Sequence, residues 1–151
     1  GSTSFSDLRD NSTVLIGAFT NDWTLRVDDR ARYYFYRNEA TGEEGIRDRQ
    51  DPARRGWSVF RPWPEWKIDE DYAIVSRIFG QNTGRVVVTA AGITQFGTSA
   101  AGEFVTNAAY LQEALGHIPS GWKKQNLQVV LGTKVVDQVA GPPRVLAVHS
   151  W

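Results

Sequence analysis

The chain has 151 residues, of which 41% are hydrophobic and 23% charged, values typical of one folded domain and unlike those of a disordered chain. Seventeen basic residues balance seventeen acidic ones, which disfavours nucleic-acid binding by this domain because such domains carry a positive excess. The absence of cysteine excludes thiol catalysis, disulfides and cysteine-ligated metals, and no apolar run approaches the roughly 20 residues that span a bilayer.

The ends and the basic residues carry further information. Gly1 and Ser2 are typical of a cloning scar, and the chain contains no methionine. We therefore expect residues 3–151 to form a single globular domain that belongs to a longer protein. Arginine outnumbers lysine thirteen to four. That excess indicates either planar contacts with carboxylates and phosphates or simply genome composition.

The first third of the chain predicts a strand, a helix and an aromatic hairpin. Residues 14–18 are a continuous apolar run, typical of a strand buried on both faces. Residues 20–22 are good helix caps and precede a predicted helix. The aromatic run 32–37 predicts a strand that turns at 40–42 and pairs with residues 46–49.

Residues 51–70 predict a long, packed surface loop, because prolines and a glycine interrupt them, with one short strand at 57–60. Aromatic residues beside arginine and proline are what protein-binding hot spots favour. The candidate partner-binding residues are Trp57, Phe60, Arg61, Trp63 and Trp66. The alternative is that these rings fold back as a satellite core.

The second half predicts two hairpins and two helices. In chain order these are strands 72–79 and 85–91 joined by loop 80–84, a glycine-bearing loop 92–98, helices 99–105 and 108–115, and strands 127–136 and 144–151 turned by 141–143. Two strand–loop–helix units and two long hairpins predict an α/β domain with a mixed sheet and helices packed on it.

The segment 90–102 is the most informative candidate site. A strand enters a glycine-bearing loop and then a helix of small residues, whose N-terminal N–H groups and partial positive charge favour an anion. Thr94, Thr98 and Ser99 supply hydroxyl groups, and Glu103 lies within one predicted turn. Neither a phosphate-binding Walker loop nor a dinucleotide fingerprint is present. In the structural alternative, Gly97 permits a tight turn and the small residues after it let the helix approach the sheet.

The strand end at Gly17 is built in the same way. If the two strands are parallel neighbours, their loops meet at the carboxyl edge of the sheet, where open α/β sheets bind ligands. The predicted ligand-binding residues are Gly17, Thr20, Asn21, Thr94, Gly97, Thr98, Ser99 and Glu103. Thr20 and Asn21 are equally well explained as a helix cap.

Catalytic signals are weak. The chain has two histidines, His117 and His149, and lacks the common metalloprotease and serine-hydrolase motifs. The acidic run 69–71 and Glu103 are the carboxylates available for acid–base chemistry, although an acidic run at a loop end is usually solvated. We assign no catalytic residue, metal or cofactor.

Three stretches carry a resemblance: VLIGAFTNDWTLR (14–26), AAGITQFGTSAAGEF (90–104), and NLQVVLGTKVV (126–136) with GPPRV (141–145). They resemble the carboxy-terminal module of a large family of uncharacterised bacterial regulator-like proteins. The resemblance implies an amino-terminal winged-helix or other regulatory domain, in some members with a membrane segment between the two. The module would then be the cytoplasmic or extracytoplasmic part of a bacterial protein. The resemblance supplies no reaction, ligand or catalytic residue.

Three hypotheses follow. The first is a non-catalytic ligand-sensing or interaction domain that holds a small polar or anionic molecule at the Gly17 and Gly97 loops, or a protein partner. The second is a carboxylate-based hydrolase or transferase, which requires paired carboxylates or a histidine in that pocket. The third is a structural or self-association module, which requires an exposed apolar patch around residues 57–66 and no pocket.

Overall fold

A computed structural model describes residues 12–28, 30–60, 67–80, 85–116, 118 and 121–151. The elements in chain order are β1 (Thr13–Ile16), α2 (Asp22–Asp28), β2 (Tyr33–Asn38), β3 (Glu43–Asp48), β4 (Ser58–Phe60), β5 (Glu70–Phe79), β6 (Val86–Gly92), α3 (Gln95–Thr106), α4 (Ala108–Leu115), the 3-10 turn η1 (Trp122–Lys124), β7 (Leu127–Val136), β8 (Val139–Ala140) and β9 (Arg144–Ser150).

Two sheets make up the β structure. The larger has six strands in the order β1-β6-β5-β7, with both β8 and β9 paired to β7. Its β1–β6 pair is parallel, and its other pairs are antiparallel. The smaller sheet is the antiparallel meander β2-β3-β4. The predicted α/β class with a mixed sheet is therefore confirmed.

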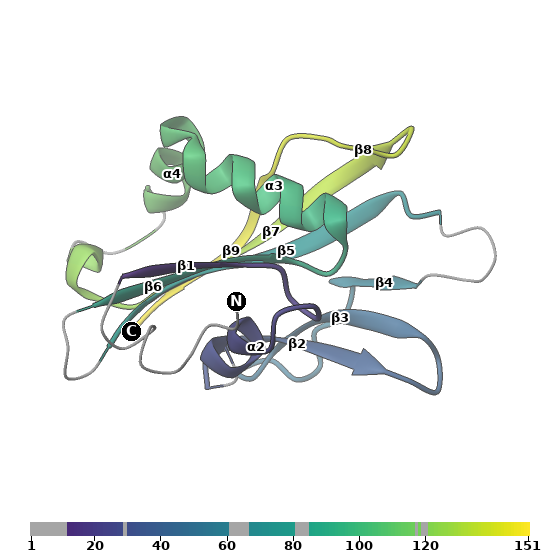
Figure 1. Cartoon of the computed structure of the whole chain (residues 1–151), viewed down its shortest axis with the longest axis horizontal. Coiled ribbons are helices and arrows are strands. Elements are labelled where there is room, and N and C mark those ends of the chain that lie inside the picture. The colour runs from purple at the N-terminus through teal and green to yellow at the C-terminus, as the bar shows by residue number, and fades with distance from the viewer. Residues whose placement is uncertain (1–11, 29, 61–66, 81–84, 117, 119–120) are drawn as a thin grey trace.

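The molecule is layered around the six-stranded sheet. Helices α3 and α4 cover one face, while the three-stranded sheet and α2 lie against the other (Figure 1). Both predicted strand–loop–helix units are present, as β1 to α2 and β6 to α3. Among the described residues, no helix is long and apolar enough to cross a membrane.

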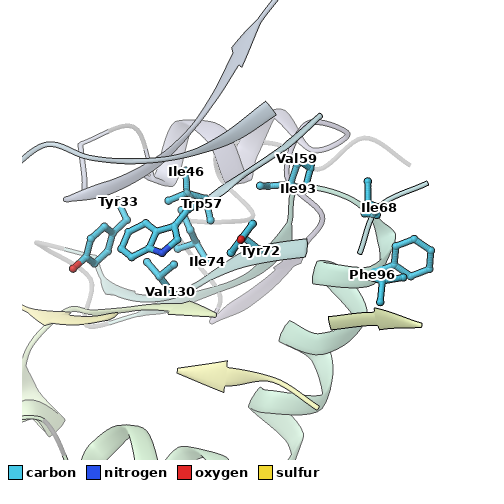
Figure 2. Close-up of a cluster of buried hydrophobic side chains, with 11 residues drawn as sticks. Tyr33, Ile46, Trp57, Val59, Ile68, Tyr72, Ile74, Ile93, Phe96 and Val130 are labelled. Carbon is cyan, nitrogen blue, oxygen red and sulfur yellow. The ribbon is translucent and has the colours of Figure 1, made fainter. Parts of the chain in front are cut away.

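The alternation of side chains along β5 produces two cores. Ala73 and Val75 pack under α3, whereas Tyr72 and Ile74 face the three-stranded sheet. Figure 2 shows the second cluster, in which the rings of Tyr33 and Trp57 lie beside aliphatic side chains from both sheets. A central strand buried on both faces explains the continuous apolar run from Tyr72 to Val75 in the middle of β5.

Gln128 joins the two sheets. This fully buried side chain on β7 accepts a hydrogen bond from the Tyr33 N–H at 2.9 Å and donates one to the Tyr33 carbonyl at 3.0 Å. It also donates to the Ser76 hydroxyl at 3.2 Å. The Gln128 amide therefore bonds to the N–H and C=O of Tyr33 as a neighbouring strand would. The amide oxygen and nitrogen of Gln128 both have hydrogen-bond partners.

The prediction for β1 was wrong in one respect. Leu15 is buried, but Val14 and Ile16 are 62% and 65% exposed, because β1 is the edge strand of the sheet. A short apolar run has the same pattern in an edge strand as in a central one, so the sequence does not distinguish the two.

Two boundaries also differ from the prediction. Helix α3 begins at Gln95 rather than at residue 99, since Thr94 caps it. The last hairpin turns at Asp137 and Gln138, both with positive φ, rather than at residues 141–143. The turn was missed because it uses aspartate and glutamine, where sequence rules look for asparagine and glycine. Helix α4 and its Asn107 cap occur as predicted.

Candidate functional site

The two predicted loops meet at one edge of the large sheet. Strands β1 and β6 are parallel neighbours, with Ile16 opposite Ala90, and the Gly17 N–H extends the pairing to the Ala90 carbonyl at 3.1 Å. Gly17 has a φ of +92°, a conformation that side chains rarely adopt, and it turns the chain toward α2. From β6 the chain reaches α3 through only Ile93 and Thr94.

A pocket of about 660 Å³ opens at this edge, a size suited to a small molecule. It lies between the ends of β1 and β6, the start of α3, the end of β2 and the β7–β8 turn. Its described lining consists of Ile16, Gly17, Ala18, Phe19, Thr20, Arg37, Ile68, Gly92, Ile93, Thr94, Gln95, Phe96, Thr98 and Gln138.

Half of the predicted ligand-binding residues line this pocket: Gly17, Thr20, Thr94 and Thr98. The other four do not. The Asn21 side chain caps α2, accepting from the N–H groups of Trp23 at 3.1 Å and Thr24 at 3.4 Å. Ser99 is exposed outside the lining, and exposed Glu103 accepts a hydrogen bond from the Tyr110 hydroxyl at 3.2 Å.

Gly97, the last of the four, is buried in the first turn of α3 and packs against β5. A Cβ atom at this position would lie 2.5 Å from the Tyr72 carbonyl oxygen. Gly92 is equally crowded, since its Cβ would lie 2.0 Å from the Thr98 nitrogen. The structural alternative therefore accounts for Gly97: a side chain there would push the helix off the sheet.

The N-terminus of α3 already holds an anion, the carboxylate of Asp71 on β5. Its Oδ2 accepts from the Gly97 N–H at 2.5 Å, the Thr94 N–H at 3.2 Å and the Thr94 hydroxyl at 2.6 Å. Its Oδ1 accepts from the Tyr72 N–H at 2.8 Å. The side chain is fully buried. Burial raises the pKa of this carboxyl, and these hydrogen bonds oppose the shift.

The acidic run 69–71 is therefore not a solvated cluster. Asp69 is exposed, Glu70 pairs with Arg144 and accepts from the Tyr72 hydroxyl at 2.8 Å, and Asp71 is the internal cap of α3. No group of three or more histidine or acidic residues able to hold a metal ion occurs in the described ranges.

The charge of the pocket is compensated. Arg37 is the one charged residue in its described lining, and its Nε donates to the carboxylate of buried Glu44 at 2.7 Å. The Arg37 guanidinium also lies 4.6 Å over the ring of Phe19, which packs edge-on against Phe35. On the side of the pocket formed by the end of β2, an aromatic surface, Phe19 packed on Phe35, thus lies beside the ion pair of Arg37 and Glu44.

Three exposed side chains of the lining are polar and uncharged: Thr20, Gln95 and Gln138; Ile16 and Arg37 are exposed there as well. The three uncharged polar side chains come from the loop after β1, the start of α3 and the β7–β8 turn. Within the part of the chain that the structure describes, none of these three side chains makes a hydrogen bond to protein. Each of these side chains can both donate and accept a hydrogen bond, as binding of an uncharged polar group requires.

Sequence reasoning missed Phe19, Arg37, Gln95 and Gln138 as pocket residues. Gln95 and Phe19 lie in the two loop segments already singled out, whereas Arg37 and Gln138 come from distant parts of the chain. Gln138 in particular reaches the pocket through a turn that the sequence placed elsewhere.

The aromatic segment is only partly described. Trp57 is buried, packing edge-on against Tyr33 at 5.8 Å between ring centroids, so it belongs to the core rather than to an exposed patch. Phe60 is 57% exposed. Arg61, Trp63 and Trp66 lie outside the described residues, as does His117.

Comparison with known protein families, with curated proteins and with solved structures found no significant match to this chain.

Proposed function

We propose that this domain is a non-catalytic ligand-binding module that holds a small uncharged molecule with polar and apolar parts. Its site is the pocket at the ends of β1 and β6. The observation that carries the proposal is that the polar side chains of Thr20, Gln95 and Gln138 line a pocket whose other lining residues are mostly apolar. Two amides and a hydroxyl match ligand hydroxyl, amide or nucleobase edges, while the rings of Phe19 and Phe96 match an apolar face.

The charge distribution supports an uncharged ligand over an anion. The helix N-terminus that would attract an anion already binds the Asp71 carboxylate, and the charge of Arg37 is paired with that of Glu44. A ligand anion would compete with both internal carboxylates. An uncharged ligand avoids that competition and needs only the polar rim.

The same lining disfavours the catalytic alternative. Paired carboxylates or a histidine within reach of one are what acid–base chemistry requires, and the described lining contains neither. As a sensing module, the domain would report occupancy of this pocket to the remainder of a longer bacterial regulatory protein, the setting that the sequence resemblance implies.

Thermal unfolding against paired compounds tests the proposal. Sugars, polyols, nucleosides and amino-acid amides are each compared with a charged counterpart. A ligand at 100 times its dissociation constant adds about 2.7 kcal/mol of stability, a shift of several degrees for a domain of this size. We expect stabilisation by uncharged members. Stabilisation by anionic members alone, or by no compound while the protein unfolds cooperatively, would contradict the proposal.

Two tryptophan substitutions one helical turn apart locate the site. Gln95→Trp places a large ring at the pocket opening, whereas Ser99→Trp places the same ring on an exposed position of α3 outside the lining. We expect Gln95→Trp to weaken binding of the identified ligand at least tenfold and Ser99→Trp to leave it unchanged, as measured by calorimetry. Equal effects of the two variants would place the ligand elsewhere.

A further inference from the structure

Arginines gather on the face of the three-stranded sheet that points away from the core. Arg47 lies 4.1 Å over the ring of Tyr36, and Arg49 lies 4.1 Å over the ring of Tyr34. These are diagonal pairs across β2 and the β3 side of the hairpin, since Tyr34 is directly opposite Arg47.

Stacking orders these guanidinium groups before any ligand arrives. A guanidinium held over an aromatic ring keeps its N–H donors in its own plane, so stacking and hydrogen bonding to a ligand are compatible. Fixing a long side chain in advance also removes part of the entropy cost of binding. The arrangement is therefore preorganised for an acceptor-rich partner.

The stacked guanidinium groups of Arg47 and Arg49 border an open depression of about 490 Å³. We call it the arginine depression; it is lined by Tyr34, Arg47, Asp48, Arg49, Pro52 and Arg55. Asp48, its one carboxylate, is buried and accepts two hydrogen bonds from Arg32, at 2.9 and 2.8 Å. That ion pair holds the pKa of Asp48 below its usual range. The negative charge of Asp48 is therefore paired with Arg32 and does not neutralise the other arginines of the depression.

Two cations of the depression are poorly neutralised. Arg47 and Arg55 each donate an Nη1 hydrogen to the same carbonyl oxygen, that of Arg54, at 3.5 and 3.0 Å, and Arg55 Nη1 also donates to the Pro52 carbonyl. Neither forms an ion pair with a carboxylate anywhere in the described ranges, although Glu43 is close enough for both to lower its pKa. Two positive charges that share one neutral acceptor repel each other, and an anion between them would relieve the repulsion.

We propose that the arginine depression binds a phosphate group. One arginine is enough to satisfy a carboxylate through a two-pronged contact, whereas a phosphate has several terminal oxygens and accepts from more than one guanidinium. Arg47, Arg49 and Arg55 line one depression and match that demand, although the Nε of Arg49 already donates to the Ala31 carbonyl at 3.0 Å. The site is built on β2, β3 and the segment after β3, and shares no lining residue with the pocket at β1 and β6.

Nuclear magnetic resonance titration at constant ionic strength tests the site. The probes are inorganic phosphate and phenyl phosphate, with acetate and benzoate as carboxylate controls. We expect saturable shifts of the backbone amides of residues 47–51 and 53–55 and of the arginine Nε–H groups with both phosphates, and weaker shifts with the carboxylates. Tighter binding of phenyl phosphate than of inorganic phosphate would identify a phosphate carried on an organic molecule; equal binding would identify free phosphate.

Charge-neutral substitutions supply the specificity test. Arg47→Gln and Arg55→Gln each remove one charged donor and should weaken phosphate binding about tenfold. Arg26→Gln is the matched control, because Arg26 on α2 is exposed as Arg55 is, and lies over a ring as Arg47 does, that of Trp23 at 5.3 Å. It should have no effect.

Equal weakening by all three variants, or shifts that do not saturate, would reduce the interaction to unspecific charge attraction and overturn the proposal. Carboxylates that bind as tightly as phosphates would overturn the choice of ligand. Gln95→Trp should leave phosphate binding unchanged, so this site and the pocket at β1 and β6 can fail independently.

Discussion

At the scale of single residues, Asp71 decides what the start of α3 can do. The residue sits in an acidic run that sequence patterns assign to solvent, yet it is fully buried with four hydrogen bonds to its carboxylate. A buried carboxylate is costly unless it is paired or hydrogen-bonded, and the N–H groups of a helix N-terminus provide those bonds. The anion site that the sequence predicts at the start of α3 is thus occupied by a carboxylate of the protein itself, that of Asp71.

Asp71→Asn tests this assignment. Asparagine keeps an oxygen for the α3 N-terminus but directs an NH₂ group at the Tyr72 N–H, so that two donors face each other in a buried site. We expect a loss of about 2 kcal/mol in the free energy of unfolding, measured by urea denaturation. The matched control Asp69→Asn makes the same charge change at an exposed position and should alter stability by less than about 0.5 kcal/mol. If Asp71→Asn leaves the free energy of unfolding unchanged, the hydrogen bonds of Asp71 to the start of α3 are not needed for stability.

At the scale of elements, the close approach of α3 to the large sheet depends on glycine. Gly92 on β6 and Gly97 on α3 stand where any Cβ would meet backbone atoms. Ala100 and Ala101 continue the contact with small, buried side chains. Because the helix lies this close to β5 and β6, Thr94 can cap it while hydrogen-bonding Asp71, and Gln95 and Phe96 are carried to the pocket.

Two alanine substitutions within α3 should act in opposite directions. In Gly97→Ala the new methyl would lie 2.5 Å from the Tyr72 carbonyl oxygen, and we expect a destabilisation of about 1–3 kcal/mol. In Gly102→Ala the methyl meets no atom within 4 Å. Alanine also costs less backbone entropy there, so we expect a gain of about 0.5–1 kcal/mol. Denaturant unfolding of the two variants provides the check, and equal changes would refute the packing argument.

At the scale of the whole molecule, the two sheets are joined by side chains from the end of the chain. Gln128 pairs with the backbone of Tyr33, and His149 on the neighbouring strand β9 packs edge-on against the Tyr33 ring. The His149 ring is stacked on Trp151 at 5.3 Å. Burial and the nearby charge of Arg32 lower the pKa of His149, while Asp48 acts in the opposite direction. We therefore expect the contact between His149 and Tyr33 to weaken when His149 is protonated.

The sign of the pH effect follows from that lowered pKa. The unfolded chain takes up the proton near the ordinary histidine pKa of about 6.5, before the folded protein does. The stability that neutral His149 contributes is present above pH ~6.5 and is lost as the pH falls through the folded pKa. We expect His149→Gln to flatten the decline in unfolding free energy just below that pH.

The comparison is cleanest in a His117→Gln background, where His149 is the chain's one histidine. Urea denaturation on either side of pH 6.5, at constant salt, measures the difference between His117→Gln and the double variant. A decline of the same steepness in both would show that the packing of His149 against Tyr33 does not couple to its protonation.

The sequence alone determined the class of the fold and most of its elements. Alternating and continuous apolar runs located β5, β6, β7 and β9 to within a few residues, and the Asn107 cap located α4. These features depend on neighbours along the chain, where periodicity and capping chemistry operate. The meeting of the Gly17 and Gly97 segments was a conditional prediction, since strand order has no local signature.

Tertiary structure alone decided which groups remain available to a ligand. Parallel pairing of β1 with β6 created the pocket, and the two-residue turn after β7 carried Gln138 to it. Asp71 and Glu44 neutralised the groups that an anion would have used. The physical reason is that hydrogen-bond and charge satisfaction is a property of contacts between distant segments. A sequence shows which donors and acceptors exist, and only the fold shows which ones are already used.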